Sequence, residues 1–294
     1  MSYSDITIIY NPNSTGSSES LAKAFKKRLQ KRMPNQAITL KPTKHAGHAE
    51  ELAYTLAKQS PHALVISSSG DGGYNEVVNG LMKARKEGSK AVAGLLPAGN
   101  ANDHYHNLHD DDLVEQIANG NHKLIDLLKL EGKSKGKKIQ RYGHSYIGFG
   151  LTPDVGKELN KTKLNLMNQV WIVTKALLNV RPVKLVIGLK ARHYDSVIFS
   201  NVDKMSKYLK ISQPSRIADG KFEVTIFRRR NKFKLIAVLL KASFVGVSED
   251  AQVSRFRLRT VHETLVQIDG EITKLDAKSR VKITMDKKAL PCVV

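Results

Sequence analysis

The chain has 294 residues, 41% of them hydrophobic and 26% charged, a globular composition that excludes a disordered chain and is long enough for two packed domains. The formal net charge of +21 favours a polyanionic partner, such as nucleic acid, nucleotide phosphates or an anionic membrane, without choosing among them. The single cysteine, Cys292, excludes an intrachain disulfide and a Cys-rich metal site.

The hydrophobic segments do not predict export or membrane insertion. Residues 1–9 lack a basic stretch followed by a long apolar core, so we expect no secretory signal. The longest apolar runs, 166–180 and 235–247, contain polar residues and are shorter than the roughly 20 residues of a spanning helix. We therefore expect a cytoplasmic protein.

Strand and helix patterns alternate over the first 124 residues. Short β-rich apolar runs predict strands at 6–10, 37–40, 63–67 and 91–96, and apolar residues at helical spacing predict helices at 18–34, 48–58, 76–86 and 113–118. A series of this kind implies a parallel sheet, which binds ligands at the carboxyl ends of its strands.

The pattern changes after Leu124. Short strands at hairpin-like spacing are predicted at 125–130, 142–149, 183–189, 196–201, 222–227, 265–268 and 281–285, with one helix at 165–179. The predicted fold class is therefore α/β followed by a second, β-rich domain.

A glycine-rich loop follows the strand at 63–67. It reads Ser68-Ser69-Gly70-Asp71-Gly72-Gly73 and leads into a helix expected to begin near Tyr74 or Asn75. Glycines and a helix N-terminus suit phosphate, and a carboxylate beside phosphates, here Asp71, indicates metal-assisted phosphoryl chemistry. Taken alone, the loop is equally well explained as a strand-to-helix turn with Asp71 as the N-cap.

Two further polar loops follow predicted parallel strands, at 11–16 and 97–103. Because parallel strands reach one sheet edge with the same polarity, we expect all three loops to converge there. The sequence contains no P-loop ending in Gly-Lys-Ser/Thr, no two-glycine dinucleotide fingerprint and no protein-kinase glycine loop.

These loops resemble those of the diacylglycerol kinase catalytic domain family, which includes bacterial lipid kinases and sphingosine kinases and is distantly similar to NAD kinases and phosphofructokinases. The family loops read Asn-Pro-x-Ser-Gly, then Gly-Gly-Asp-Gly-Thr followed by Asn-Glu-Val-Val-Asn-Gly, then Pro-x-Gly-Thr-x-Asn-Asp. The matching residues are Asn11, Pro12, Ser14 and Gly16; Gly70-Asp71-Gly72 with Asn75-Glu76-Val77-Val78-Asn79-Gly80; and Pro97, Gly99, Asn102 and Asp103. Further matches are Thr43 with Gly47-His48-Ala49, Ile125-Asp126, Gly148, Gly150, Ala218-Asp219-Gly220 and Ile268-Asp269-Gly270-Glu271.

The resemblance covers nearly the whole chain and implies two domains. The first is an α/β nucleotide-binding domain with a parallel sheet, residues 1–124, completed by the C-terminal segment 286–294. The second is a β-sandwich, residues 125–285.

The resemblance also implies ATP and Mg²⁺ as cofactors. The residues implied in nucleotide binding are Asn11, Pro12, Asn13, Ser14, Thr15, Gly16, Thr43, Ser69, Gly70, Asp71, Gly72, Gly73, Asn75, Gly99, Asn100, Asn102 and Asp103. Asp71 would act near the phosphates and Mg²⁺, and Glu271 would be the general base that takes the proton of a lipid hydroxyl. A simple hairpin turn also accounts for residues 269–271.

A structural Mg²⁺ is implied at Asp219, helped by the backbone carbonyls of Arg216 and Lys221. A surface turn over residues 218–221 explains this segment nearly as well.

Two residues depart from the family pattern. Gly73 and Asn100 stand where the family has threonine, and Gly73 cannot donate a hydrogen bond from a side chain. Loss of a hydroxyl bonded to a charged phosphate costs about 1.5 to 3 kcal/mol. Weak ATP use, an altered nucleotide choice and a pseudoenzyme therefore stay open, and a Gly73→Thr change is expected to raise activity if the missing hydroxyl matters.

The histidines after the third loop and two basic stretches are weaker indications of a binding site. His104, His106 and His109 favour a solvated segment rather than a zinc site, because alternate residues of a loop rarely converge tetrahedrally. The basic stretches 133–138 and 228–234 suit nucleic acid or anionic lipid, although solvated hairpin tips account for them when taken alone.

The predicted function is transfer of the ATP γ-phosphate to a lipid alcohol, with diacylglycerol as first candidate and phosphatidic acid as product. The alternatives are NAD kinase-like phosphorylation of a small molecule, and a catalytically weak or inactive protein that binds lipid or polyanions. We expect peripheral contact with an anionic membrane surface and no specific nucleic acid, and homodimer formation stays open.

Overall fold

The computed structural model describes residues 3–14, 17–99, 102–108, 112–150, 182–202, 204–205, 209–210, 218–229 and 251–293. The chain divides into two compact units. The first comprises Met1–Asp126 with Lys287–Val294, and the second comprises Leu127–Asp286.

The first unit is built on a parallel sheet in the order β2-β1-β3-β4-β17. Its strands are β1 (Ile6–Tyr10), β2 (Ile38–Pro42), β3 (Leu64–Ser69), β4 (Val92–Pro97) and the end of β17 (Arg280–Cys292). Its helices are α1 (Ser18–Arg32), α2 (His48–Gln59), α3 (Asp71–Arg85), α4 (Asp103–Leu108) and α5 (Leu113–Ala118).

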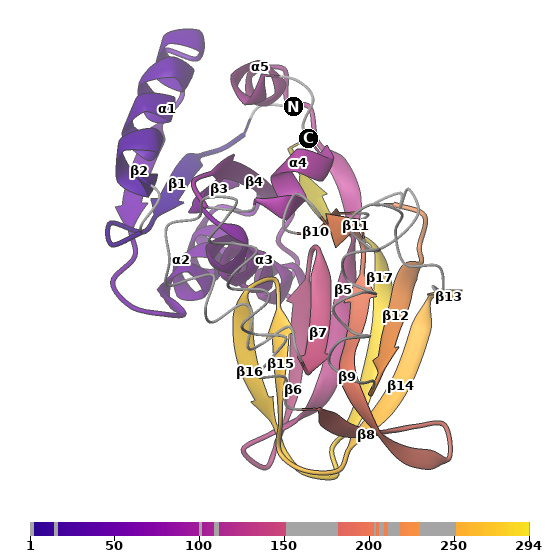
Figure 1. Cartoon of the computed structure of the whole chain (residues 1–294). Helices are drawn as coiled ribbons and strands as arrows, with labels where there is room; N and C mark the ends of the chain where they lie inside the picture. Colours follow the sequence, from indigo (N-terminus) through magenta and orange to yellow (C-terminus); the bar gives the residue numbers. More distant parts are fainter. Residues whose placement is uncertain are drawn as a thin grey trace. The chain divides into compact units, whose positions relative to one another are not determined.

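Helices cover both faces of this sheet, with α1 and α5 on one side and α2 and α3 on the other (Figure 1). Ile6, Ile8 and Ile66 of the strands form one core with Phe25 of α1 and Ile117 of α5. Burial on both faces explains why the strands read as continuous apolar runs. The predicted α/β character of this part is confirmed.

The second unit is a mainly antiparallel β-structure. Its strands are β5 (Lys123–Ser134), β6 (Lys137–Gly143), β7 (Tyr146–Gly150), β8 (Val183–Ile187), β9 (Lys190–Ser200), β10 (Lys204–Met205), β11 (Leu209–Lys210), β12 (Phe222–Arg228), β13 (Ala251–Val253), β14 (Arg255–Thr260), β15 (Thr264–Ile268), β16 (Glu271–Leu275) and β17. The strand order is β16-β15-β7-β9-β8-β14-β17; β5 pairs with β17 and β6, and β12 pairs with β9 and β13.

The core of the second unit lies between the apolar faces of these strands. Phe149, Phe199 and Phe222 are fully buried, and Phe199 meets the other two edge to face at ring-centroid distances of 6.2 and 6.0 Å. The β-rich second part of the predicted fold class is confirmed.

The structure differs from two predictions in the first unit. Helix α3 begins at Asp71 rather than near Tyr74, because the carbonyl of Gly70 already accepts the N–H of Tyr74 at 3.1 Å. The segment after the third loop, interpreted as a loop, forms the short helix α4, whose six residues are too few for a periodic pattern.

Two predictions in the second unit were also wrong in detail. The single strand expected over 142–149 is interrupted at His144 and Ser145, which separate β6 from β7. Strands β14 and β16 were not predicted, because their outward residues are charged or polar and they contain no apolar run.

The helix predicted at 165–179 and the apolar run 235–247 lie outside the described residues. Among the helices that the structure does describe, none combines the length and apolar character needed to span a membrane.

Candidate nucleotide-phosphate site

The strand order of the first unit contains a switch point between β1 and β3. The chain passes from β1 outward to β2 and then returns to the other side of β1 to form β3. In open parallel sheets, ligands bind outside the carboxyl ends of the strands at such a point. The loop after β1 and the start of α3 lie at these two strand ends.

The start of α1, which follows the first loop, is fixed to the end of β3 by two serines. Ser18 Oγ donates to the carbonyl of Ser68, and Ser68 Oγ donates to the carbonyl of Ser18 at 2.8 Å. Asn11 Oδ1 accepts the N–H of Asn13 at 2.9 Å, which closes an Asx turn. Asn11, Pro12 and Asn13 are exposed, whereas Thr15 and Gly16 lie outside the described residues.

The second and third loops touch through two glycines. A β-carbon on Gly70 would lie 3.1 Å from the Cα of Gly99, and one on Gly99 would collide with the Cα of Gly70. The N–H of Ala98 also donates to the carbonyl of Ser69 at 3.0 Å. Glycine is therefore required at both positions by close backbone approach, and the predicted convergence of these loops is observed.

Asp71 is the first residue of α3 and is half-buried. Its Oδ1 accepts the N–H of His104 at 3.4 Å, so the second loop is joined to the start of α4. The start of a helix favours negative charge, and a carboxylate is a ligand type that Mg²⁺ prefers.

The third loop is closed by Asn102. Its Oδ1 accepts the N–H of Gly99 at 2.9 Å, and its Nδ2 donates to the carbonyl of Gly99 at 2.8 Å. Asn102 is buried and has a positive φ of 50°. Asn100 lies outside the described residues, and for Asp103 the structure describes only the backbone.

Gly73 stands where the family pattern has threonine. In the structure, Ser69 lies where a side chain at position 73 would be. A β-carbon on Gly73 would lie 2.7 Å from both Cβ and Oγ of Ser69. The family pattern Gly-Gly-Asp-Gly-Thr has glycine at position 69 and threonine at position 73. In this chain the hydroxyl-bearing side chain is at position 69, and it occupies the space that a side chain at position 73 would need.

The segment from Asn75 to Gly80, which carries the family signature most closely, holds α2 against α3. Glu76 accepts the N–H groups of Gly47 at 2.8 Å and Ala49 at 3.1 Å, and so caps α2. A β-carbon on Gly80 would collide with the carbonyl of Glu50. Asn75 is buried, and Nδ2 of Asn79 donates to its carbonyl at 2.9 Å.

Thr43 follows β2, and its N–H donates to the carbonyl of Tyr10 at 2.8 Å. This bond continues the pairing of β1 with β2 and places Thr43 beside the start of the first loop.

Glu271 belongs to the second unit and is exposed at the first position of β16. The turn before it is a tight hairpin in which Asp269 and Gly270 both have positive φ values, 47° and 96°. Asp269 is fully buried, and its carboxylate accepts the N–H groups of His144, Ser145 and Tyr146 at 2.6, 2.9 and 2.8 Å. The hairpin and the interruption between β6 and β7 therefore stabilise each other.

Asp219 is exposed in a turn, and its Oδ1 accepts the N–H of Lys221 at 2.9 Å. Arg216, the other predicted carbonyl donor, lies outside the described residues.

One of the three histidines differs from its predicted environment. His104 is fully buried and packs against Tyr74 with ring centroids 5.1 Å apart, so it does not belong to a solvated segment. His106 is exposed, and His109 lies outside the described residues.

The sequence analysis missed a group of metal-ligand side chains near the start of α2. Potential ligand atoms of His45, His48 and Glu51 lie within 4.8 Å of one another. Nδ1 of His48 accepts the N–H of Lys44 at 3.0 Å, so a neutral His48 carries its proton on Nε2 and has no free lone pair for a metal in this arrangement. The spacing by three of His45, His48 and Glu51, across the start of α2, was the available signal.

Comparison with known sequences gives the same family as the loops. The family model for the diacylglycerol kinase catalytic domain matches residues 5–130. A diacylglycerol kinase of Bacillus subtilis (strain 168) is 26% identical over 293 residues, covering 90% of this chain and 88% of that protein. A diacylglycerol kinase of Staphylococcus carnosus (strain TM300) is 25% identical over 251 residues, covering 80% of this chain and 76% of that protein.

Two solved structures have folds similar to that of this chain. A protein of Bacillus anthracis str. Sterne assigned as a diacylglycerol kinase matches with a TM-score of 0.73 at 18% identity, covering 100% of this chain and 98% of that one. Yeast NADH kinase matches with a TM-score of 0.53 at 12% identity, covering 100% of this chain and 84% of that one. Together with the loops at the switch point, these matches show that residues 5–130 are similar to the diacylglycerol kinase catalytic domain and that most of the chain is similar to bacterial diacylglycerol kinases.

Proposed function

We propose that the chain is an ATP-dependent kinase that transfers the γ-phosphate to the hydroxyl of a lipid alcohol. Diacylglycerol is the first candidate acceptor, and phosphatidic acid would be the product. The observation that carries this proposal is the contact of Gly70 with Gly99 beside Asp71, at the N-terminus of α3. Bare backbone, a helix N-terminus and a carboxylate together match the needs of a nucleotide phosphate with its cation.

The residues of the first unit fit ATP and Mg²⁺. Phosphate oxygens would be bound by backbone N–H groups at the start of α3, beside the close approach of Gly70 and Gly99. The hydroxyl of Ser69 would add a bond to the phosphates, and the first loop and Thr43 would bind the rest of the nucleotide. Bound Mg²⁺ would neutralise charge on the phosphates, and Asp71 is the carboxylate that would hold it there.

Glu271 is proposed as the general base. An exposed carboxylate that is held in a fixed hairpin can accept the proton of an acceptor hydroxyl as that hydroxyl attacks the γ-phosphorus. The anchoring of Asp269 supports this role, since it fixes the backbone on which Glu271 stands. We also retain Asp219, with the carbonyls of Arg216 and Lys221, as a proposed structural Mg²⁺ site.

Transfer of radiolabel from ATP to a panel of lipid alcohols in mixed micelles tests this function. Asp71→Asn is expected to lose transfer together with the Mg²⁺-dependent part of ATP binding. Glu271→Gln is expected to lose about a hundredfold or more in rate while ATP binding stays unchanged, because a general base acts on the acceptor. Absence of both an ATP-dependent thermal shift and label transfer in the unsubstituted protein would refute the proposal.

One observation favours a second candidate function. The fold likeness to yeast NADH kinase supports phosphorylation of a dinucleotide hydroxyl instead of a lipid. Adding NAD and NADH to the acceptor panel separates the two functions. A catalytically inactive protein that binds lipid or polyanions is less well supported, because Ser69 supplies a hydroxyl beside Gly73.

A kinase acting on a membrane lipid would work from the cytoplasm at an anionic bilayer. We propose such peripheral contact. The sequence leaves both a monomer and a homodimer open, and size-exclusion chromatography distinguishes them.

A further inference from the structure

One face of the second unit is strongly basic. Strands β6, β5, β17 and β14 are neighbours in that order, and they alternate between buried apolar residues and outward polar ones. Leu130, Val281, Ile283 and Leu258 point into the core. The residues of opposite parity carry the outward cations, which are Lys129, Lys133, Lys138, Arg255, Arg257, Arg259, Arg280 and Lys282. We call this surface the basic face.

Like charges stand opposite one another across the basic face. Lys133 pairs with Lys138, Arg257 with Lys282, and Arg259 with Arg280. Directly opposed like charges on adjacent strands destabilise a sheet. Three such pairs on four strands therefore indicate a surface that is suited to a counter-charge from outside the chain.

Few carboxylates neutralise this charge from within. Glu131 lies on the basic face and pairs with Lys282 at 2.9 Å. Asp276, in the turn before β17, accepts the N–H groups of Lys135 and Gly136 at 2.7 and 2.8 Å. Asp286, in the middle of β17, interacts with Tyr142, and its charge contributes to the raised pKa of that tyrosine, whose largest cause is burial. Within the part of the chain that the structure describes, Lys133, Lys138 and Arg280 have no ion-pair partner.

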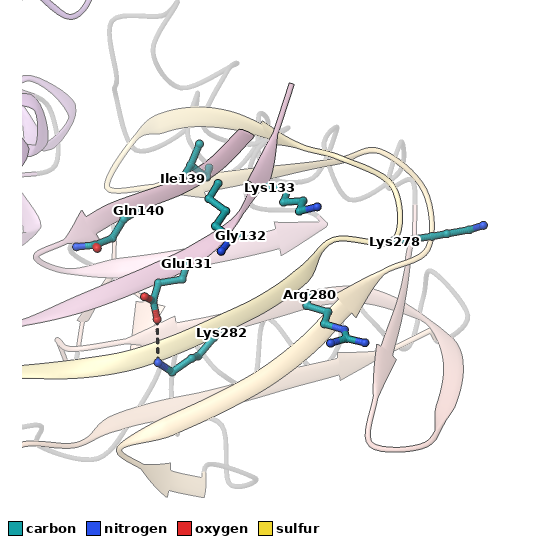
Figure 2. Close-up of a pocket in the computed structure, with 9 residues that line it drawn as sticks. Glu131, Gly132, Lys133, Ile139, Gln140, Lys278, Arg280 and Lys282 are labelled. Carbon is teal, nitrogen blue, oxygen red and sulfur yellow. Dashed lines mark hydrogen bonds and ion pairs between the residues drawn. The ribbon is translucent and has the colours of Figure 1, made fainter. Parts of the chain in front are cut away.

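The basic face contains a hollow of about 630 Å³. The cations that line it come from three chain segments, namely Lys133 and Lys138 of the β5–β6 hairpin, Lys278 of the turn before β17, and Arg280 and Lys282 of β17, and Glu131 is the one carboxylate among the described lining residues. Figure 2 shows Lys133, Arg280 and the Glu131–Lys282 pair in this region. The bonds of Asp276 to the hairpin tip, and that of the N–H of Lys133 to Ser279 Oγ at 2.8 Å, fix the hairpin to the turn. The cations are therefore carried on a rigid backbone.

We propose that the basic face docks the protein on an anionic bilayer, with a lipid headgroup phosphate seated in the hollow. The choice of a bilayer rests on the proposed function, because a lipid kinase must reach an acceptor held in a membrane. Guanidinium and ammonium groups around one hollow suit phosphate oxygens, and each cation near an anionic membrane strengthens binding by roughly fivefold. The described part of this face carries no exposed aromatic side chain for base stacking, which disfavours single-stranded nucleic acid.

Vesicle co-sedimentation without ATP tests the proposal independently of any kinase activity. The probes are vesicles of phosphatidylcholine, alone or mixed with phosphatidylglycerol, at low and high salt. The unsubstituted protein is expected to bind the mixed vesicles preferentially and to lose this binding at high salt, because salt screens exposed charges. Lys133→Ala with Lys138→Ala and Arg280→Ala should weaken binding on the order of a hundredfold.

The matched control is Lys27→Ala with Lys31→Ala and Lys90→Ala, which removes the same charge from exposed positions of the first unit. It should bind within about twofold of the unsubstituted protein. A charge-conserving variant with Lys133→Arg, Lys138→Arg and Arg280→Lys should retain binding, which separates charge loss from misfolding. Equal losses in the alanine variant and its control would overturn the proposal. So would an absence of preference for anionic vesicles, or tight binding of duplex DNA or RNA with no vesicle binding.

Competition with inorganic phosphate distinguishes a site for a lipid headgroup from a site for a free anion. Competition by millimolar phosphate that abolishes vesicle binding at constant ionic strength would show a site for a free anion and overturn the docking proposal. Label transfer to a short-chain, water-soluble diacylglycerol reports the kinase separately. Loss of that transfer with intact vesicle binding would reject the proposed function and leave the basic face as a membrane surface.

Discussion

At the scale of single residues, Ser69 and Gly73 compete for one space. A β-carbon on Gly73 would lie 2.7 Å from Cβ and Oγ of Ser69. Gly73→Thr alone is therefore expected to lower the melting temperature and the kcat/KM for ATP, since overpacking costs about 1 to 3 kcal/mol. This reverses the expectation from sequence, in which the added threonine simply restored a missing hydroxyl.

Substitutions at position 69, alone and combined with Gly73→Thr, provide the control. Ser69→Gly alone should reduce kcat/KM about ten- to a hundredfold, because it removes the hydroxyl without replacing it. Ser69→Gly with Gly73→Thr rebuilds the family order and should recover most of the loss in both stability and activity. If the Gly73→Thr protein showed raised activity and an unchanged melting temperature, Ser69 would not compete with a side chain at position 73.

Cys292 is the only cysteine of the chain, so alkylation of its thiol can be measured without interference from other thiols. Its thiol is fully buried against Tyr74, with Sγ 3.2 Å from the phenolic oxygen, and burial raises the pKa of Cys292 to about 12. The native protein should therefore resist alkylation at about pH 9, where the unfolded chain reacts readily.

The same shift predicts how stability depends on pH. The unfolded thiol loses its proton near its ordinary pKa of 9.0, whereas the native thiol stays neutral, so this stabilising contribution is lost as pH rises from about 9 toward about 12. Cys292→Ala should flatten this part of the stability profile measured by denaturant unfolding. Rapid alkylation of the native protein would show that the thiol is accessible.

At the scale of secondary-structure elements, the hairpin of β15 and β16 carries two carboxylates with different expected roles. Asp269 is fully buried and accepts three backbone N–H groups, whereas Glu271 is exposed. Asp269→Asn should destabilise the second unit by about 3 kcal/mol, because an amide places its own donors against buried ones. Glu271→Gln should leave stability unchanged. Urea unfolding of both variants measures this contrast, and equal stability of the two would show that Asp269 does not anchor the hairpin.

The strands and helices that were predicted, and those that were missed, show which sequence patterns identify secondary structure in this chain. Strands β1, β3 and β4 and helices α1, α2 and α5 were predicted because each carries a run or a period of apolar residues that packs against the sheet. Strand β14, Arg255–Thr260, was missed because alternate arginines interrupt every apolar run, although this alternation is itself the pattern of a half-buried strand. The early start of α3 was missed because glycines at its first turn suggest a loop.

At the scale of the whole molecule, the net charge of +21 should limit stability at low salt. Like charges repel one another in the compact state, and added salt screens this repulsion. Raising sodium chloride from tens to hundreds of millimolar should stabilise the protein by on the order of 1 kcal/mol, or about 2 to 4 °C in apparent melting temperature. Differential scanning calorimetry over this range measures the effect, and a falling melting temperature would show that favourable ion pairs outweigh the repulsion.

The sequence by itself determined the α/β and β-rich parts, the resemblance to the diacylglycerol kinase catalytic domain and the three loops, because strand periodicity and glycine spacing are local properties of the chain. Only the tertiary structure decided that Ser69 fills the space beside Gly73, that Gly70 and Gly99 touch, and that Asp269 serves as a buried anchor. It also decided that cations from four strands share one face. These features depend on strand register and backbone approach between segments far apart in the chain, which no local pattern encodes.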